Sequence, residues 1–304
     1  MSEIVCFIHS CNINVLGTEK LDMILDYLKN FKLFDKFKYI FINNVGNKID
    51  EIKYSQISSN IRVINYSRET SSYENCTLRQ LYFFSQINSN YKILYLHTKG
   101  IGYSKNHPWY GPVDSWNRFM LYCLVDKYEE CLEMLDHFDV VGCQYRSYPY
   151  DNDPSHFSGN FWWANSNYIK TNDIYYLKDK YDAEFWLFRK NPTFINLGKC
   201  LTATYQTLCY PDEYVTTIDN NVKSIIYNIN NPKKVKILYG SENNYIDVTD
   251  ICKEKLTYNN ITHIPSNDNI RASILGDPAF GIVKHILIGN VKYPQNEDIM
   301  VKLS

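Results

Sequence analysis

Apolar and polar residues alternate over about residues 1–200 in a pattern that predicts strands and helices in turn. Short continuous apolar runs, which are typical of strands buried on both faces, occur at residues 4–8, 39–42, 61–64, 91–96 and 139–141. Between them, Leu21, Ile24, Leu25 and Leu28 follow the spacing of an amphipathic helix, and further helices are predicted at residues 78–84 and 116–135. This order predicts an α/β fold with a mainly parallel sheet flanked by helices.

Polar residues follow several of these apolar runs, at the point where each predicted strand ends. In a parallel sheet of this kind, ligands bind at the carboxyl ends of the strands. The residues at those positions are therefore the first candidates for a binding site. They are His9, Ser10 and Cys11, then Asn43 and Asn44, then His97, Thr98 and Lys99, and finally Gly142.

The pattern changes near residue 228 to short strand-like runs separated by turn residues. These runs cover residues 235–239, 245–248 and 284–288. We therefore predict an α/β domain at residues 1–227 and a small β-rich appendage at residues 228–304. Self-association into a homo-oligomer is one role that we consider for the appendage.

The charge and composition exclude some classes of function. With 32 Lys+Arg against 33 Asp+Glu, the net charge is −1, whereas a general nucleic-acid binder has a basic excess. No apolar stretch is long enough for a membrane span, and residues 1–16 lack the pattern of a secretory signal, so we expect a cytoplasmic protein. The abundance of asparagine and tyrosine is typical of a giant virus or a low-GC microbe, and a viral origin would place the protein in the host cytoplasm or the virion.

Cysteine spacing and short motifs add little positive information. The nine cysteines contain no C-x-x-C pair, so we expect buried reduced thiols and neither a zinc site nor a disulfide framework. The motifs G-x-x-x-x-G-K-[ST], H-E-x-x-H and G-x-S-x-G are all absent. The familiar nucleotide-triphosphatase, metalloprotease and hydrolase sites are therefore not supported.

Two longer strings carry a family resemblance. Residues 96–100 read Leu-His-Thr-Lys-Gly, and residues 156–163 read His-Phe-Ser-Gly-Asn-Phe-Trp-Trp. With these strings the chain resembles, over about residues 1–215, GT-A-type glycosyltransferases related to the rhamnan-synthesis group, in which His-Thr-Lys stands in place of Asp-x-Asp. The resemblance implies a GT-A-like fold. It also implies a glycosyltransferase that moves a sugar from a UDP-, GDP- or dTDP-sugar to a glycan or protein acceptor. Residues 1–227 would then be the catalytic domain, and binding of the acceptor glycan is the second role that we consider for the appendage at residues 228–304.

The resemblance assigns the diphosphate of the donor to the end of the fourth strand. His97 and Lys99 would stabilise the leaving diphosphate, with Thr98 and the Gly100 backbone beside them. Arg118 would join Lys99 there or simply pair with Asp114. The alternative is that His97 and Lys99 only cap a strand.

A cation at Lys99 makes strict metal dependence unnecessary, although Mn²⁺ or Mg²⁺ stays an option. Asp151 and Asp153 are the only Asp-x-Asp pair, and two carboxylates so close suit a hard cation. They follow the fifth predicted strand instead of the fourth. A solvated turn is therefore the competing interpretation.

The second string would form the sugar and acceptor pocket. Of the adjacent Trp162 and Trp163, we expect one indole to be exposed and to stack on a pyranose ring. His156, Ser158 and Asn160 would bind hydroxyl groups, and Gly159 would allow close approach. The competing interpretation is an ordinary strand that places one indole in the core and the other on the opposite face.

The remaining site residues are a base and a nucleotide-binding group. Glu184 is our choice for the carboxylate that takes the proton of the acceptor hydroxyl, with Asp182 in reserve, although an acidic residue also suits the start of a helix. His9, Ser10, Asn43, Asn44 and Thr77 would bind the base and ribose of the donor. Glu74 and Thr77 also belong to a Glu-x-x-Thr-Leu string similar to one in the same family, and a helix cap explains this string equally well.

Two other functions compete with transfer. One is a non-catalytic protein of the same fold that binds a nucleotide sugar or a carbohydrate. The other is a nucleotidyltransferase, which is less favoured because residues 9–17 lack a glycine- and arginine-rich loop.

Overall fold

The computed structural model describes residues 2–146, 154–199, 206–230, 236–241, 244–258, 261–288, 291–293, 295 and 298–302. The chain forms two compact units, Met1–Val215 and Thr216–Ser304. Helix α8, Pro211–Asn230, contains the boundary between them. The assignment of residues 1–227 to catalysis and of residues 228–304 to an appendage stays a prediction.

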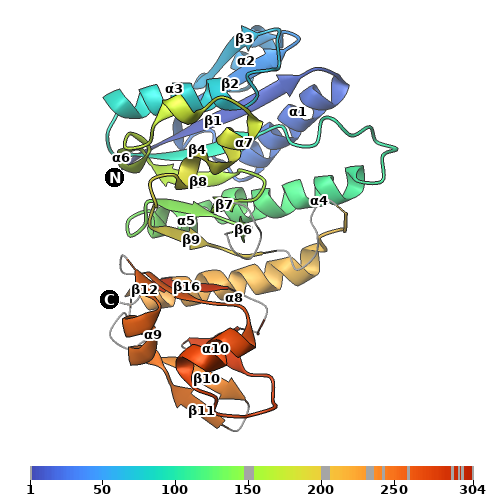
Figure 1. Cartoon of the computed structure of the whole chain (residues 1–304). Helices are drawn as coiled ribbons and strands as arrows, with labels where there is room; N and C mark the ends of the chain where they lie inside the picture. The colour runs from blue at the N-terminus through green and yellow to red at the C-terminus, as the bar shows by residue number, and fades with distance from the viewer. Residues whose placement is uncertain are drawn as a thin grey trace. The chain divides into compact units, whose positions relative to one another are not determined.

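A seven-stranded sheet forms the centre of the first unit, in the order β3-β2-β1-β4-β8-β5-β9 (Figure 1). The neighbours β3-β2, β2-β1, β1-β4 and β5-β9 are parallel, and β8 is antiparallel to both β4 and β5. The predicted α/β fold with a mainly parallel sheet is therefore confirmed. The strands are β1 Glu3–Asn12, β2 Phe37–Gly46, β3 Ile61–Ser67, β4 Tyr91–His97, β5 Val140–Gly142, β8 Trp162–Asn165 and β9 Phe194–Asn196.

Helices connect and flank these strands (Figure 1). Those of the first unit are α1 Val15–Asn30, α2 Glu51–Ile57, α3 Asn75–Ile87, α4 Tyr110–Leu121, the π-helix η1 Tyr122–Asp126, α5 Tyr128–Met134, α6 Ser166–Ile169, α7 Lys180–Phe185, and the 3₁₀ helices Ile174–Tyr176 and Trp186–Phe188. A two-stranded ribbon pairs β6, Tyr145–Arg146, with β7, His156–Phe157.

The apolar runs in the sequence explain why β1 and β4 lie at the centre of the sheet. Residues 4–10 of β1 and all of β4 are buried, so helices cover both faces. The parallel register pairs His9 of β1 with Asn43 of β2 on one side and with His97 of β4 on the other. Three polar residues that are far apart in the sequence thus form one row across the carboxyl ends of neighbouring strands.

Some elements differ from the sequence prediction. Helix α2 was not predicted because only Tyr54 of its seven residues is buried, which leaves almost no apolar periodicity. Strand β8 interrupts the parallel order by lying between β4 and β5. The predicted helix from Trp116 to Leu135 is in fact α4, η1 and α5, and it begins earlier, at Tyr110.

The second unit contains small antiparallel sheets, as the strand-like runs predicted. They have the orders β11-β10-β14-β15 and β12-β13-β16. The strands are β10 Ile237–Ser241, β11 Asn244–Asp247, β12 Thr257–Tyr258, β13 Ile261–Ile264, β14 His285–Ile288, β15 Val291–Tyr293 and β16 Ile299–Lys302. The sequence did not predict the helices α9, Thr249–Lys255, and α10, Asp268–Leu275. Alternate residues of β10 and β14 fill a core of this unit's own, together with Val248, Cys252 and Leu275.

The state of the cysteines and the hydropathy of the helices can be compared with the expectations from the sequence. Seven described cysteines are free thiols, as expected. Cys209 is disulfide-bonded, so the expectation of reduced thiols is wrong at that position. In the described segments, every helix is too short or too polar to cross a bilayer.

Trp163 of β8 connects the sheet to the π-helix. Its side chain is fully buried, stacks on Phe37 with ring centroids 6.1 Å apart, and donates from Nε1 to the Leu124 carbonyl at 2.7 Å. We predict that Trp163→Phe lowers the free energy of unfolding by about 1–3 kcal/mol, because the buried Leu124 carbonyl loses this donor. Urea unfolding followed by tryptophan fluorescence measures this in the first unit, which contains all five tryptophans.

Ile87→Ala is the matched control, because Ile87 is 84% exposed at the end of α3. It should change the free energy of unfolding by about 0.5 kcal/mol or less. Equal effects of the two substitutions would show that the Trp163 hydrogen bond does not stabilise the sheet.

Candidate functional site

The carboxyl ends of β1 and β4 are held together by backbone and side-chain hydrogen bonds. The Thr98 amide donates to the His9 carbonyl at 3.0 Å, and the Cys11 amide donates to the Thr98 hydroxyl at 2.9 Å. Thr98 therefore aligns the two strands, and its hydroxyl is already an acceptor for the backbone. The side chains of His9 and His97 lie at this junction and are both buried.

His9 is a neutral core histidine that contacts helix α3. Its Nδ1 lies 3.0 Å from the Thr77 hydroxyl, which is itself fully buried. Burial lowers the pKa of His9 from 6.5 to about 4, against the opposing effect of the Glu74 charge. His9 and Thr77 thus bond each other beneath the strand ends.

Both ring nitrogens of His97 face protein atoms. Nε2 lies 2.8 Å from the Gly159 carbonyl, which can only accept, so this nitrogen carries the proton. Nδ1 lies 3.6 Å from Oε1 of Glu74. Burial first, and then the nearby Lys99 charge, lower the pKa of His97 to about 3. This arrangement leaves no N–H of His97 for a phosphate, so a direct bond from His97 to the diphosphate is not available here.

Lys99 presents a cation at the end of β4. Its Nζ lies 4.3 Å from the centroid of the Trp116 ring, a cation–π contact, and it has no hydrogen-bond or ion-pair partner among the described residues. Burial lowers the pKa of Lys99 below its usual 10.5, while the charges of Glu184 and Glu74 act in the opposite direction. Gly100 follows with a positive φ of 84°, and a Cβ there would lie 2.5 Å from Val113. The turn thus depends on glycine.

Glu74 lies in this site although it was not among the predicted site residues. It stands at the N-cap position of α3, but its side chain makes no capping hydrogen bond. Instead, its Oε2 accepts from the Tyr95 hydroxyl at 2.9 Å and from Nδ2 of Asn160 at 2.6 Å. One signal could have identified it: a helix after a parallel strand begins at the carboxyl edge of the sheet, so its first residues share that edge with the strand ends.

The turn at Gly159 and Asn160 closes the site from the side of β8. Gly159 has a φ of 94°, and a Cβ would lie 2.4 Å from the Met120 sulfur and 2.9 Å from the Trp116 ring. Asn160 has a φ of 55°, donates to Glu74 and to the Ala183 carbonyl, and accepts from Nε1 of Trp162. Asn160 therefore links this turn to α3 and to α7.

Glu184 comes from α7 and is half-buried, as a base open to an acceptor requires. Its charge acts on both His97 and Lys99. Asp182, the reserve residue, accepts from the Asp179 amide in a capping box and pairs with Arg189 at 2.9 Å. Its carboxylate thus serves the helix start, which favours Glu184 of the two.

Several other predicted residues have side chains that are occupied by contacts within the protein. Neither Trp162 nor Trp163 is exposed, so the expectation of an exposed sugar-stacking indole is wrong: Trp162 stacks on Tyr95 at 4.9 Å, in the core. Arg118 pairs with Asp114 at 3.0 Å, the alternative left open for it. His156 is buried, with Nδ1 2.7 Å from the Pro154 carbonyl.

The predicted nucleotide-binding asparagines are buried in and around β2. Asn44 donates to the Asn47 carbonyl and to Asn65. Neither the amide oxygen nor the amide nitrogen of Asn43 has a partner within the described segments, and the same holds for the buried Ser10 hydroxyl. Ser158 is also buried, and its backbone amide donates to the Gln144 carbonyl. The binding roles of these residues stay predictions.

The two possible metal ligands, Asp151 and Asp153, lie outside the described residues. Within the described part of the chain, no three His, Cys, Asp or Glu residues are grouped so that they could hold a metal ion.

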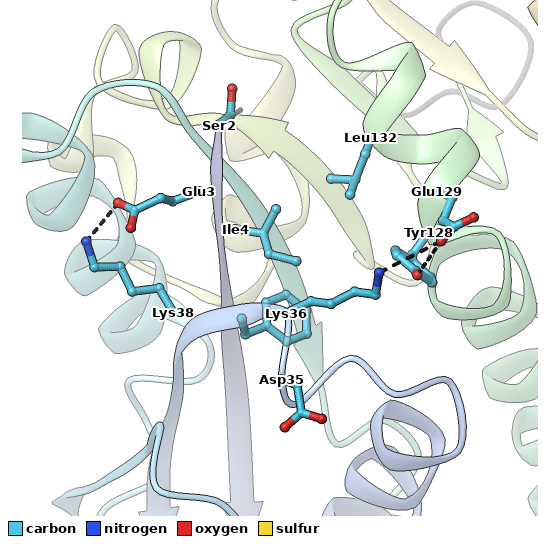
Figure 2. A pocket seen from close by; sticks show the side chains of 10 residues that line it. Ser2, Glu3, Ile4, Asp35, Lys36, Lys38, Tyr128, Glu129 and Leu132 are labelled. Carbon is cyan, nitrogen blue, oxygen red and sulfur yellow. Dashed lines mark hydrogen bonds and ion pairs between the residues drawn. The ribbon is translucent and has the colours of Figure 1, made fainter.

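A separate pocket lies at the opposite edge of the sheet, beside the amino ends of β1 and β2. Figure 2 shows Lys38 pointing towards Glu3, and Lys36 pointing towards Tyr128 and Glu129. Nζ of Lys38 donates to Glu3 at 2.7 Å, and Nζ of Lys36 lies 3.9 Å from Glu129. Each lysine already faces a carboxylate, and none of the predicted site residues lines this pocket.

The chain is similar to one protein family and to several solved structures. A family model described as Domain of unknown function (DUF8361) matches residues 14–186. No curated protein matches. Among solved structures, the chain is similar to 4-diphosphocytidyl-2C-methyl-D-erythritol synthase from Anaerococcus prevotii DSM 20548, with 12% identity, a TM-score of 0.38, and coverage of 72% of this chain and 98% of that chain.

Two further solved structures are similar over 72% of this chain. One is another 4-diphosphocytidyl-2C-methyl-D-erythritol synthase, with 9% identity, a TM-score of 0.35 and 97% of its chain covered. The other is Rv0371c from Mycobacterium tuberculosis H37Rv, with 10% identity, a TM-score of 0.35 and 98% of its chain covered. The fold class of the present chain rests on its own sheet order and not on these likenesses.

The buried histidines predict a loss of stability in acid. An unfolded histidine takes up a proton near pH 6.5, whereas folded His9 does so only near pH 4, so the unfolded state binds more protons between these values. The free energy of unfolding should therefore fall as the pH falls through this range, by up to about 1.4 kcal/mol per pH unit for this group. Urea unfolding at pH 7, 6 and 5 measures this fall.

The variant His9→Gln should reduce this pH dependence, because it removes one of the titrating groups. His137→Gln, at an exposed position, is the control and should keep the wild-type dependence. If both variants keep the wild-type dependence, His9 is not buried in its neutral form.

Proposed function

The chain belongs to the family described as Domain of unknown function (DUF8361), and since that description assigns no activity, we propose from the geometry of the site that the protein is a glycosyltransferase. It would transfer a sugar from a nucleotide sugar, with UDP, GDP or dTDP as the nucleotide, to a glycan or protein acceptor. One observation carries the proposal. The ammonium of Lys99, at the carboxyl end of a central parallel strand, forms no ion pair or hydrogen bond with a carboxylate in the described part of the chain.

A nucleotide-sugar donor needs such a cation at one place. When the bond between the anomeric carbon and the diphosphate oxygen breaks, its electron pair leaves with the diphosphate, whose negative charge rises. A half-buried ammonium stabilises that charge more than an exposed one does, because water screens it less. Lys99 therefore stabilises the leaving group, and the backbone of the Gly100 turn lies next to it.

The acceptor hydroxyl needs a base. Its oxygen forms the new bond to the anomeric carbon, and its proton passes to a carboxylate. Glu184 lies on the segment that also holds Asn160 through the Ala183 carbonyl, and its charge acts on Lys99. In this proposal Glu184 takes the proton, while His97 supports the wall of the site because both of its ring nitrogens face protein atoms.

A protein that only binds a nucleotide sugar is the second candidate. The observation that favours it is the engagement of His97 with Gly159 and Glu74, which leaves Lys99 as the only cation of this group at the strand end. Donor hydrolysis separates the two functions, because a transferase cleaves its donor slowly even without an acceptor. A protein that only binds the donor would show a thermal shift and no cleavage.

We expect the purified protein to hydrolyse one of the UDP-, GDP- or dTDP-sugars, identified first by a thermal-shift screen with and without Mn²⁺. Lys99→Met should lower kcat for this hydrolysis by about 10²–10³-fold, because the leaving diphosphate loses its cation. Arg118→Met is the matched control, since the Arg118 cation is paired with Asp114, and it should keep most of the activity. Equal losses in the two variants would contradict the role of Lys99.

Glu184→Gln should lower the rate of sugar transfer by about 10²–10⁴-fold, because the amide cannot take the acceptor proton. The thermal shift with the donor should persist, since the amide keeps the size of the side chain. Glu69→Gln, at an exposed position, is the control. If Glu184→Gln transfers sugar at the wild-type rate while His97→Ala is inactive, the base is not Glu184.

A further inference from the structure

Of the five tryptophans, all of which the structure describes, Trp109 is the one with a well exposed side chain. It is 37% exposed, whereas the other four are 5% exposed or less. Trp109 lies at the N-cap position of α4, at the end of the segment that follows Lys99. Figure 1 shows the chain running out past the end of β4 before it turns back into α4. An exposed aromatic surface of this kind indicates a binding site.

Tyr103 and His107 pack against Trp109 and form with it an aromatic cluster, which we call the loop platform. The ring centroids of Tyr103 and His107 lie 5.6 and 5.4 Å from that of Trp109, and 4.8 Å from each other. The indole plane makes an angle of 76° with the Tyr103 ring and of 70° with the His107 ring. The three rings are therefore in contact and present aromatic faces in two directions.

Two polar groups of the loop platform are not used within the protein. The Trp109 amide donates to Nδ1 of His107 at 3.2 Å, so in the neutral ring the proton lies on Nε2. Neither this Nε2 nor the Tyr103 hydroxyl has a hydrogen-bond partner in the described part of the chain. Sites for small molecules combine aromatic walls with a few polar groups that fix the orientation of the ligand. The loop platform has both.

The segment that carries the loop platform is attached to the start of helix α1. Lys105 pairs with Glu19 of α1 at 2.8 Å, and the Asn14 amide at the N-cap of α1 donates to the Ile101 carbonyl at 3.0 Å. A surface that is already ordered loses less conformational entropy when a ligand binds. The loop platform is therefore a preformed surface.

The loop platform lies along the same face of α4 as the site at Lys99. Trp109, Val113 and Trp116 are four and three residues apart, the spacing of neighbours on one helix face. Val113 lies against Gly100, and the Trp116 ring faces the Lys99 ammonium. The seven residues from Trp109 to Trp116 span about 10 Å of helix. A ligand on the loop platform would therefore lie beside the group that reacts at Lys99 and not in its place.

We propose that the loop platform of Tyr103, His107 and Trp109 binds a carbohydrate, namely a sugar unit of a glycan acceptor next to the unit that is glycosylated. A pyranose has an apolar face that packs on an indole, and hydroxyl groups that bond Nε2 of His107 and the Tyr103 hydroxyl. Trp109 thus takes the stacking role that was expected of Trp162 or Trp163. Carbohydrate binding stands on these contacts alone, whereas the role as acceptor rests on the proposed function.

An array of immobilised plant, bacterial and animal oligosaccharides tests carbohydrate binding by the whole protein without a donor. We expect the wild type to bind at least one of them. Trp109→Ala should weaken this binding about tenfold or more, because the aromatic anchor of a binding site carries a large share of the binding free energy. Phe83→Ala, which removes an exposed aromatic side chain of α3, is the matched control and should bind as the wild type does. No binding by the wild type, or binding unchanged in Trp109→Ala, would overturn the proposal.

Iodide quenching of tryptophan fluorescence locates the bound sugar. Because Trp109 is the exposed indole, it should account for most of the quenching, and Trp109→Phe should remove that part. The phenylalanine keeps an aromatic ring, so this variant also guards against an alanine variant that does not fold. The oligosaccharide bound most strongly on the array should protect wild-type fluorescence from iodide, and UMP, GMP and dTMP should not. Protection by a nucleotide alone would assign the loop platform to the donor and overturn the proposal.

Donor hydrolysis separates a failure of this proposal from a failure of the proposed function. If the protein binds an oligosaccharide through Trp109 but cleaves no nucleotide sugar, glycosyl transfer fails and carbohydrate binding stands. If it cleaves a donor while no oligosaccharide protects Trp109 from iodide, the loop platform proposal fails alone. When both hold, the KM for the bound oligosaccharide as acceptor should rise about tenfold or more in Trp109→Ala and stay at the wild-type value in Phe83→Ala.

Discussion

The hydrogen bond from the Asn160 amide to the Glu74 carboxylate is the contact on which the arrangement of this site depends. It joins the start of α3 to the turn before β8, and through the Ala183 carbonyl the same amide reaches the helix that carries Glu184. A partly buried carboxylate is stabilised by hydrogen bonds that replace the water it loses. Tyr95 and Asn160 both donate to Oε2 of Glu74, so a strand, a turn and a helix start are joined at one carboxylate oxygen.

The sheet was predictable because strands buried on both faces appear in the sequence as continuous apolar runs. Residues 4–8 and 91–96 predicted β1 and β4, and the rule for parallel sheets then placed His9 and His97 at the same edge. Their pairing in register follows from the adjacency of the two strands, which the sequence pattern does not show. The small antiparallel sheets of the second unit were also predictable, because turn residues separate their strands.

The site was less predictable, because its main contacts join residues from different elements. Glu74 looks like an ordinary helix start until its side chain is seen to bond Tyr95 and Asn160. The pair Trp162 and Trp163 suggests a sugar platform, but Trp162 packs on Tyr95 and Trp163 on Phe37, so both indoles of β8 are buried. Arg118 has the same charge as Lys99, yet its spacing of four residues from Asp114 on one helix determined its partner.

The distribution of thiols gives each unit its own chemical probe of local opening. Cys252 is the only cysteine of the chain beyond residue 215, and it is buried in the core of the second unit. Burial raises the pKa of its thiol to about 12, as burial also raises the pKa of Cys6 in β1. Neither thiol can react with an alkylating reagent until its surroundings open. The two modification rates therefore report separately how often each core is exposed to solvent.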